Sequence, residues 1–333
     1  MKVNSALFSE EESKKFYEDR YRKGYMEDWS RDKKQRVREV ISALNLPASG
    51  RALDFGCGNG VFTAIIKQQL PGWEVTGAEI SHTALVNAAT RITDCSFLMT
   101  DEIITKNITY DFVFTHHVLE HVNDLDETLK IISGVVAQNG IVLHILPCGN
   151  KGSFEYHHSQ VYKNGIDPVN GRFFFEEEGH LRRLASGQLI GLETQSGFSL
   201  VKNFFSNHYY GALWWLIHAG WEVIQQFTDT SNIPDATAVK KIIRLRKKLE
   251  NIYKHKRRVE MGWNKLSNHF RLRLKFALLA MPAAGLFFLY SKIIIWYYRT
   301  QKNNEWKIRK TDPRGSEMYL AFEKVRSADF EKQ

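Results

Sequence analysis

The chain has 333 residues, of which 43% are apolar and 25% are charged, close to the averages of globular proteins. This length suits one large domain or two modest ones, and the composition excludes a chain that is disordered throughout. Three widely spaced cysteines, Cys57, Cys95 and Cys148, argue against a secreted disulfide framework and against a cysteine metal site. Because the N-terminus also shows no apolar leader, we expect a cytoplasmic protein.

The net charge of +9 is concentrated in one late segment. Residues 240–310 contain 20 Lys and Arg against three acidic residues, whereas the rest of the chain carries 26 basic and 34 acidic groups. Such an asymmetry indicates contact with a polyanion, which is either an anionic membrane surface or a nucleic acid.

The N-terminal residues are charged and aromatic, and their helical spacing is strongest over 33–44. From Arg51 the pattern changes to short apolar runs that alternate with amphipathic stretches. The apolar runs predict five strands, at 52–55, 74–80, 95–100, 110–115 and 140–147. The stretches between them predict helices at 61–69, 81–91 and 124–137. Strand and helix in alternation indicate an α/β fold with a doubly wound, mostly parallel sheet.

The regular alternation then ends. Residues 148–180 are rich in Gly, His, Asn and aromatic residues, which suits a lid or a substrate loop. Ser186 is placed to cap a short helix that runs to about Gln195, and a strand is predicted at 197–205. A last strand is predicted at 317–325, beyond about a hundred residues of helix-like sequence.

These patterns divide the chain into four parts. We expect an N-terminal helical cap (1–45), a core (46–207), a helical insertion that is both basic and apolar (208–312), and a last core strand with a tail (313–333).

A glycine-rich turn follows the first predicted strand and precedes the helix at 61–69. It reads Asp54, Phe55, Gly56, Cys57, Gly58, Asn59 and Gly60. Glycines there let the backbone bend sharply and approach a ligand, and the helix that follows offers free N–H groups. Glu79, followed by Ile80, ends the second strand, where a carboxylate can accept both hydroxyls of a ribose, and Asp101 ends the third. A dinucleotide fingerprint would need Gly or Ala at position 61, which is Val.

The stretch ALDFGCGNG at 52–60 resembles the first motif, (V/L)LDxGCGxG, of class I S-adenosylmethionine-dependent methyltransferases. The resemblance implies a Rossmann-like sheet of seven strands and S-adenosyl-L-methionine as the cofactor. It places the glycine turn against the methionine part of this donor, the ribose at Glu79 and the adenine near Asp101. In that fold the seventh strand is antiparallel and lies beside the sixth, which assigns 317–325 as that strand.

The fourth strand carries a second resemblance. Residues 110–124, YDFVFTHHVLEHVND, are similar to the LEHV subgroup, which contains ubiquinone-pathway O-methyltransferases and many sugar and natural-product methyltransferases. Thr115, His116 and His117 end this strand at the edge of the sheet where ligands bind, so we expect them to line the methyl end of the donor. Either histidine could act as the base that a hydroxyl acceptor requires, or could merely shape the pocket.

Two further histidines are candidate catalytic residues. His121 belongs to the LEHV run, where it and Glu120 could instead fix the loop by hydrogen bonding, and His180 precedes the helix at 186. No acidic triad suited to a metal ion is apparent, so no metal site is predicted. Tyr17, Tyr21 and Trp29 could cover the donor or simply pin a helix to the core.

The insertion contains an apolar run, 276–298, that only Ser291 and Lys292 interrupt. As one helix it would be about 34 Å long, enough to cross a bilayer. A single crossing, however, would separate the strand at 317–325 from its sheet. We therefore favour a helix or hairpin that lies in the headgroup layer, held there by neighbouring Lys and Arg. The alternatives are a buried helix, a dimer interface, and RNA binding by the basic stretch 240–258.

Together these features predict an enzyme that moves a methyl group from S-adenosyl-L-methionine to a small or lipid-linked acceptor. Oxygen is the favoured acceptor atom, and association with anionic membrane lipids is expected through 208–298. An RNA or protein methyltransferase that uses the basic arm is the second hypothesis, and its binding would weaken steeply with salt. The third is a donor-binding regulator without catalysis. The oligomeric state is left open.

Overall fold

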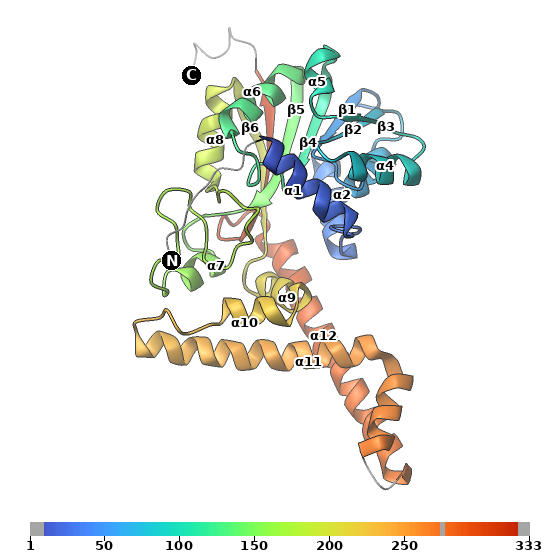
Figure 1. Ribbon diagram of the computed structural model, residues 1–333, viewed down its shortest axis with the longest axis vertical. Coiled ribbons are helices and arrows are strands. Elements are labelled where there is room, and N and C mark those ends of the chain that lie inside the picture. The colour runs from blue at the N-terminus through green and yellow to red at the C-terminus, as the bar shows by residue number, and fades with distance from the viewer. Residues whose placement is uncertain (1–9, 274–276, 326–333) are drawn as a thin grey trace.

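The computed structural model describes residues 10–273 and 277–325, without the side chains of 263–283 (Figure 1). A seven-stranded sheet with the order β3-β2-β1-β4-β5-β7-β6 forms its centre. The strands are β1 (Arg51–Phe55), β2 (Glu74–Glu79), β3 (Ser96–Met99), β4 (Tyr110–His116), β5 (Val136–Pro147), β6 (Phe198–Ser206) and β7 (Glu317–Lys324). The first five pair in parallel, and β7 pairs antiparallel with both β5 and β6. The predicted fold class is confirmed, including the antiparallel last strand beside the sixth.

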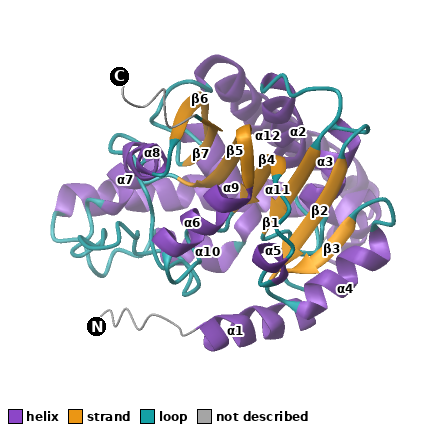
Figure 2. Ribbon diagram, turned by 90° about the horizontal axis from the view of Figure 1, so that it is seen from above, coloured by secondary structure: helices purple, strands orange, loops and turns teal. Residues whose placement is uncertain are grey.

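Helices cover both faces of this sheet (Figure 2). Those of the N-terminal segment and the core are α1 (Glu10–Arg22), α2 (Arg31–Ala43), α3 (Val61–Gln69), α4 (His82–Arg91), α5 (Glu102–Thr105), α6 (Leu125–Val135), α7 (Phe154–Ser159) and α8 (Ser186–Gln195). Side chains of α2 and α3 share one apolar cluster with one face of the sheet. Those of α6 and α8 share a second cluster with the other face. The two clusters are the two halves of a three-layer core.

Capping residues set where the core helices begin. Ser81 accepts a hydrogen bond from the Ala84 N–H at the start of α4, and Asp124 does the same for α6. The predicted cap at Ser186 is wrong by one position. Ala185 occupies the cap, and its N–H donates to the side chain of Gln188, while the Ser186 hydroxyl lies 3.1 Å from Asn150 Oδ1. The nearby amide competes for the hydroxyl, so Ser186 enters the first turn instead.

In its described residues, the insertion between β6 and β7 forms four helices, namely α9 (Tyr209–Ala219), α10 (Trp221–Phe227), α11 (Ala236–Arg273) and α12 (Ala277–Arg309). Helices α11 and α12 lie side by side, and their far ends project away from the core (Figure 1). The helix α11 breaks at Gly262, whose φ of 70° is left-handed. The near end of α12 is fixed to α2, because Trp306 Nε1 donates to Glu39 at 2.6 Å and Lys302 pairs with Asp32 at 2.5 Å.

Part of the predicted apolar run 276–298 lies outside the described residues, namely residue 276 and the side chains up to 283. Among the residues that are described, none of the helices combines the length and the apolar character that crossing a bilayer requires.

Candidate functional site

A cavity of about 770 Å³ lies beyond the carboxyl ends of the parallel strands. One end is formed by the glycine turn and by Glu79, and the middle by the histidines that end β4. The other end is formed by the insertion, through side chains of α9, α10 and α12. The cavity therefore joins the predicted donor end to the helical insertion.

The glycine turn takes a shape that side chains would obstruct. Gly56 and Gly58 have φ of +78° and +52°, in the left-handed region. A Cβ at Gly56 would lie 2.4 Å from Val118 Cγ2, and one at Gly58 would lie 2.7 Å from the hydroxyl of Tyr21. Glycine is thus required at both positions, for conformation and for space.

The carboxylate of Glu79 fixes this turn and faces the cavity. Its Oε2 accepts the N–H of Gly58 at 2.9 Å, and its Oε1 accepts those of Ile80 at 2.9 Å and Ser81 at 3.2 Å. Burial raises the pKa of Glu79, and these three N–H donors oppose the rise. Since a carboxylate offers about four acceptor positions, one remains for a ribose hydroxyl. The residues present therefore fit the ribose of S-adenosylmethionine.

The N-terminal segment covers the donor end of the cavity. Tyr17, Tyr21 and Trp29 all line it, as proposed from the sequence. The carboxylate of Glu18 ties α1 to the start of α4 by accepting the Ser81 hydroxyl at 2.6 Å. The Asn59 side chain in the glycine turn donates to the carbonyl of Tyr25 at 3.0 Å, so the cover and the turn are joined directly.

Not all of the predicted donor residues reach the cavity. Asp54, Gly56, Cys57, Gly58, Asn59, Glu79, Ile80 and His116 line it. Phe55 and Thr115 do not, because neighbours along a strand point to opposite faces of the sheet. Phe55 is in the apolar core, and the hydroxyl of Thr115 lies 2.8 Å from Nδ1 of buried His144. Gly60 begins α3 outside the cavity lining, and Asp101 is exposed at the start of α5.

His116 and His117 occupy the middle of the cavity in different electrostatic settings. Nδ1 of His117 lies 2.7 Å from Glu120 and its Nε2 lies 3.4 Å from Glu317, and these carboxylates raise its pKa despite burial. His116 packs against Trp29 and Phe62, and its Nε2 has no hydrogen-bond partner among the described residues. Burial and the nearby Lys33 hold the pKa of His116 well below 6.5. The carboxylates therefore favour the cationic form of His117, whereas burial favours the neutral imidazole of His116.

The LEHV turn is fastened to the segment that precedes α8. The Nδ1–H of His121 donates to the carbonyl of Gly179 at 2.7 Å, and the N–H of Leu181 donates to that of Glu120 at 2.8 Å. Arg182 donates to the carbonyls of Leu119 and Asn123 at 3.0 and 2.9 Å. These bonds support the reading of His121 as a residue that fixes the loop.

The structure also brings together three groups that the sequence did not connect. Ligand atoms of Glu120, His121 and His180 all lie within 4.8 Å of one another, so this set could hold a divalent ion. No metal site was predicted from the sequence, because two of these residues are adjacent and the third is about 60 positions away. Each group also has another neighbour, since Glu120 faces His117 and His180 faces Glu176 at 3.5 Å.

A cluster of buried ions borders the histidines. The carboxylate of Glu317, at the start of β7, contacts Lys33 and lies 3.9 Å from Arg36. It also accepts the hydroxyls of Ser206 at 2.7 Å and Tyr319 at 2.6 Å. Next to this cluster, Arg183 pairs with Glu155 at 2.5 Å and Glu176 at 2.7 Å, and it donates to the carbonyl of Ser316 at 3.1 Å.

Sequence reasoning missed the charged residues of this cluster. Lys33 and Arg36 lie on the same face of α2 as the core residues Val37 and Val40, so a buried position was readable from their spacing. Glu317 begins a strand that is otherwise apolar, and Lys302 lies four positions before Trp306. A charge in an apolar pattern was the available signal at each of these positions.

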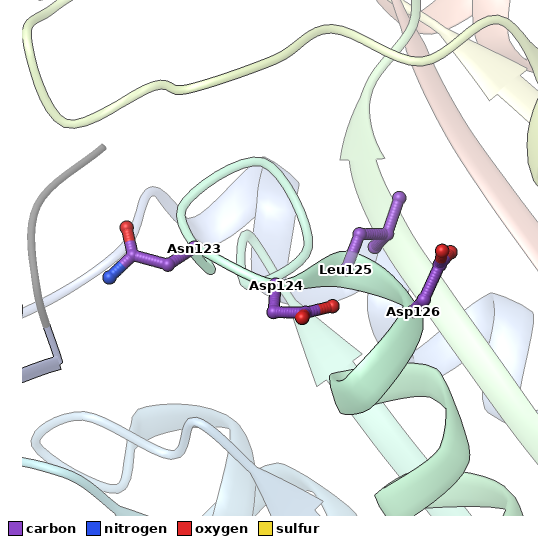
Figure 3. Close-up of a pocket in the computed structure, with 4 residues that line it drawn as sticks. All are labelled: Asn123, Asp124, Leu125 and Asp126. Atoms are coloured by element: carbon purple, nitrogen blue, oxygen red, sulfur yellow. The ribbon is translucent and has the colours of Figure 1, made fainter. Parts of the chain in front are cut away.

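A second, shallow hollow of about 310 Å³ lies at the start of α6 (Figure 3). Four consecutive residues, Asn123 to Asp126, line it, and their side chains point in different directions. Asp124 is occupied in capping α6, so this hollow is explained by the local structure.

Replacement of Glu79 tests the donor end. We expect Glu79→Ala to weaken binding of S-adenosylhomocysteine by roughly ten- to a hundredfold, because a hydrogen bond to a charged acceptor is worth about 1.5–3 kcal/mol. Titration calorimetry measures the change. Glu74→Ala, on the same strand, is the control, since Glu74 is exposed and pairs only with the exposed Arg51 at 3.2 Å. Equal affinities of the two variants would contradict the assignment.

Comparison with known proteins agrees with this geometry. Residues 26–226, more than half of the chain, match the family model described as a methyltransferase domain. Trans-aconitate 2-methyltransferase of Methylobacterium radiotolerans is 29% identical over 131 residues, which cover 37% of this chain and 50% of that protein. The corresponding enzyme of Variovorax paradoxus is 26% identical over 114 residues, which cover 33% and 44%. The chain thus spans about half the length, or less, of these relatives.

Solved methyltransferase structures are similar at low identity. A TehB-like methyltransferase from Corynebacterium glutamicum has a TM-score of 0.38 at 16% identity, with 57% of this chain and 86% of that one covered. Coclaurine N-methyltransferase bound to N-methylheliamine and SAH has a TM-score of 0.43 at 14% identity, with 87% and 72% covered. The glycine turn, the strand order and the matched domain lead to one conclusion: the chain belongs to the class I S-adenosylmethionine-dependent methyltransferase family.

Proposed function

We propose that the protein transfers a methyl group from S-adenosylmethionine to an oxygen of a small or lipid-linked acceptor at a membrane surface. The observation that carries the proposal is the cavity itself, which runs from the glycine turn, past His116, to the helices of the insertion. The donor supplies an electrophilic methyl group on a sulfonium. Glu79 and the glycine turn would bind and orient the donor, while Tyr21 and Trp29 would exclude water.

His116 is the better base for a hydroxyl acceptor. A base must be neutral at the working pH and must have a free nitrogen within reach of the proton. His117 has a carboxylate against each nitrogen and a raised pKa, so it is suited to donating a hydrogen bond. The His116 ring lines the cavity and burial favours its neutral form, and its Nε2, though buried, makes no hydrogen bond among the described residues, so it is the nitrogen left to accept the proton of a hydroxyl that reaches it.

The insertion supplies the acceptor end of the cavity. Trp214, Trp215 and His218 of α9 line it, together with Val223 and Gln226 of α10. A wall of this kind has apolar surface with a few polar groups, which suits a small amphipathic molecule or the head of a lipid-linked one. Two of the relatives carry trans-aconitate in their names, so a small carboxylic acid is included among the candidate acceptors.

An exposed apolar stripe on α12 supports membrane docking. Its residues recur at helical spacing and are Leu286, Leu289, Tyr290, Ile293, Trp296 and Tyr297. Leu286 is 70% exposed and Trp296 is 65% exposed. The basic side chains of Lys292 and Arg299 lie along the same stretch and are exposed, as a contact with anionic lipid requires.

The stripe contacts a helix that lines the cavity. Tyr297 packs edge-on against Tyr210 of α9, with 6.4 Å between ring centroids, and Gly211 and Trp214 of that helix line the cavity. An acceptor held in a membrane by an apolar tail could therefore enter from the stripe.

Label transfer tests the acceptor class. The protein is incubated with methyl-labelled S-adenosylmethionine and a fractionated lysate of its source cells, and the products are partitioned between organic solvent and water. We expect label in the organic phase, and much less of it with Asp54→Ala or Glu79→Ala at a subsaturating donor concentration. Label confined to water and sensitive to nuclease or protease would instead favour a macromolecular acceptor held by the basic helix α11.

Vesicle sedimentation tests the docking. We expect the protein to sediment with vesicles that contain phosphatidylserine, and the double variant Leu289→Glu/Trp296→Glu to bind at least tenfold more weakly, since burying one such side chain is worth about 1.5–3 kcal/mol. Val169→Glu is the control, because Val169 is 84% exposed but belongs to the loop before α8. If the stripe variant and the control bind equally well, α12 is not the docking element.

A further inference from the structure

The acceptor end of the cavity contains more positive than negative charge. Lys33 and Arg36 approach it from α2, and Lys302 approaches it from α12. Their side chains are only 9%, 10% and 1% exposed, so none of them is a solvated surface cation. Buried cations normally have matched partners, because an unpaired charge away from water is costly.

The carboxylates near these cations are too few to match them. Glu317 serves both Lys33 and Arg36, and it also faces His117. Asp32 serves both Lys302, at 2.5 Å, and Arg299, at 3.2 Å. Three buried Lys and Arg side chains thus have two carboxylates between them, and Asp32 is shared further with the half-exposed Arg299. The other buried arginine that lines the cavity, Arg183, differs in pairing with two carboxylates, those of Glu155 and Glu176.

Hydrogen-bonding capacity is also left over. Within the described residues, the hydrogen bonds of Arg36 come from Nη1, to Ser206 at 2.9 Å and Asn207 at 3.2 Å. Its Nε and Nη2 therefore remain for a ligand in the cavity, and a guanidinium is well suited to the two oxygens of a carboxylate or phosphate.

The pKa of Lys302 is consistent with an excess of positive charge at this end of the cavity. Burial and the neighbouring Arg36 guanidinium lower the pKa of Lys302 to about 8, although Asp32 opposes the shift. Burial likewise lowers the pKa of Lys33, where Arg36 adds to the effect and Glu317 opposes it. An anion placed among the three side chains would relieve this repulsion.

We propose that Lys33, Arg36 and Lys302 form a subsite for an anionic group, a phosphate or a carboxylate, carried by the methyl acceptor. The inference rests on the proposed function, because it assigns the acceptor to this end of the cavity. The anion would lie beside Trp214, whose ring is 5.2 Å from the Lys302 ammonium, while the reacting atom points toward His116. The acceptor is therefore an organic anion whose charged group and reacting hydroxyl are bound at different points of one cavity.

Anion binding to the full chain, without donor, tests the subsite. Inorganic pyrophosphate and citrate are titrated in a calorimeter against the protein and against Lys302→Gln and Arg36→Gln. We expect both variants to bind about ten- to a hundredfold more weakly, the loss typical of one charge-assisted hydrogen bond. Lys307→Gln is the control, because Lys307 is on the same helix but exposed, and it should bind as the wild type does. Lys302→Arg, which keeps the charge, should restore most of the affinity.

Two results would overturn the subsite: neither anion binds, or the Lys302 and Arg36 variants bind no worse than Lys307→Gln. Binding of S-adenosylhomocysteine by each variant shows that it is folded. Failure of the anion test with methyl transfer intact would reject the subsite alone, whereas anion binding without any methyl transfer would keep the subsite and reject the proposed function.

A second comparison separates the two sources of the anion. Polyprenyl phosphate in detergent micelles is compared with neutral polyprenol in the same micelles and with soluble pyrophosphate. Tighter binding of the lipid phosphate than of pyrophosphate, lost in Lys302→Gln, supports a lipid-linked acceptor. Equal binding of the two phosphates supports a soluble one. Binding of the neutral polyprenol as tight as that of its phosphate would contradict recognition of the charge.

Discussion

Replacing His116 with phenylalanine should reduce the rate of methyl transfer by about 10²–10⁴-fold, the usual contribution of a general base. Phenylalanine preserves the ring that packs against Trp29 and Phe62, so the shape of the cavity is retained. Binding of S-adenosylhomocysteine should not change, because the donor is held by Glu79 and the glycine turn. Single-turnover rates with the acceptor fraction, measured beside calorimetry, separate the two effects.

The pH dependence of the reaction gives a second readout of His116. Burial keeps the pKa of this imidazole well below 6.5, so the base is already neutral through the physiological range. The rate should therefore stay level at neutral pH and should fall only on the acidic side of 6.5, and the His116→Phe variant should lack this fall. His157→Ala is the control, since His157 is exposed on α7. An acidic limb that persists in His116→Phe would assign the proton transfer to another group.

The largest effect on stability is expected at Glu317. Replacing it with glutamine preserves its size but leaves Lys33, Arg36 and His117 without their shared carboxylate. Breaking a buried ion pair typically costs about 3–5 kcal/mol, so we expect a loss of that order in the free energy of unfolding. Urea denaturation at neutral pH measures it. Glu323→Gln, at the other end of the same strand, is the control, since its carboxylate is not in this cluster.

The same carboxylate makes stability depend on pH in a defined direction. Burial would raise the pKa of Glu317, but Lys33 and His117 outweigh it and hold the pKa well below 4.5. Because the folded-state pKa is below the unfolded one, the stabilisation is complete above about 4.5 and is lost as the pH falls toward the folded-state pKa. Wild-type stability should thus decline more steeply than that of Glu317→Gln below this pH. Parallel declines would show that the pair does not stabilise the fold.

The sheet could be predicted from the sequence because its signals are local. Apolar runs of strand length, the glycine turn and the caps at Ser81 and Asp124 each act within a few residues, and the helix at 61–69 has the predicted bounds. The antiparallel last strand was predictable only through the family resemblance, since its partners β5 and β6 lie more than a hundred residues earlier.

The acceptor end could not be predicted, because it is built from contacts between distant segments. Lys302 and Asp32 are 270 positions apart, and Lys33 and Glu317 are 284 apart. On an isolated amphipathic helix such lysines resemble a solvated face. They are buried by distant segments, Lys33 against Glu317 of β7 and Lys302 against Asp32 and Trp214. The pair His116 and His117 illustrates the same limit, since these adjacent histidines differ through the carboxylates that the fold places beside His117 and through the burial of His116 near Lys33.

The most direct test of the whole account is a crystal structure of the protein with S-adenosylhomocysteine. We predict a ribose hydroxyl within hydrogen-bond distance of Glu79, the methionine part against Gly56 and Gly58, and the sulfur facing His116 across the cavity. A ligand bound elsewhere, or one whose sulfur points away from His116 and the helices of the insertion, would contradict the account.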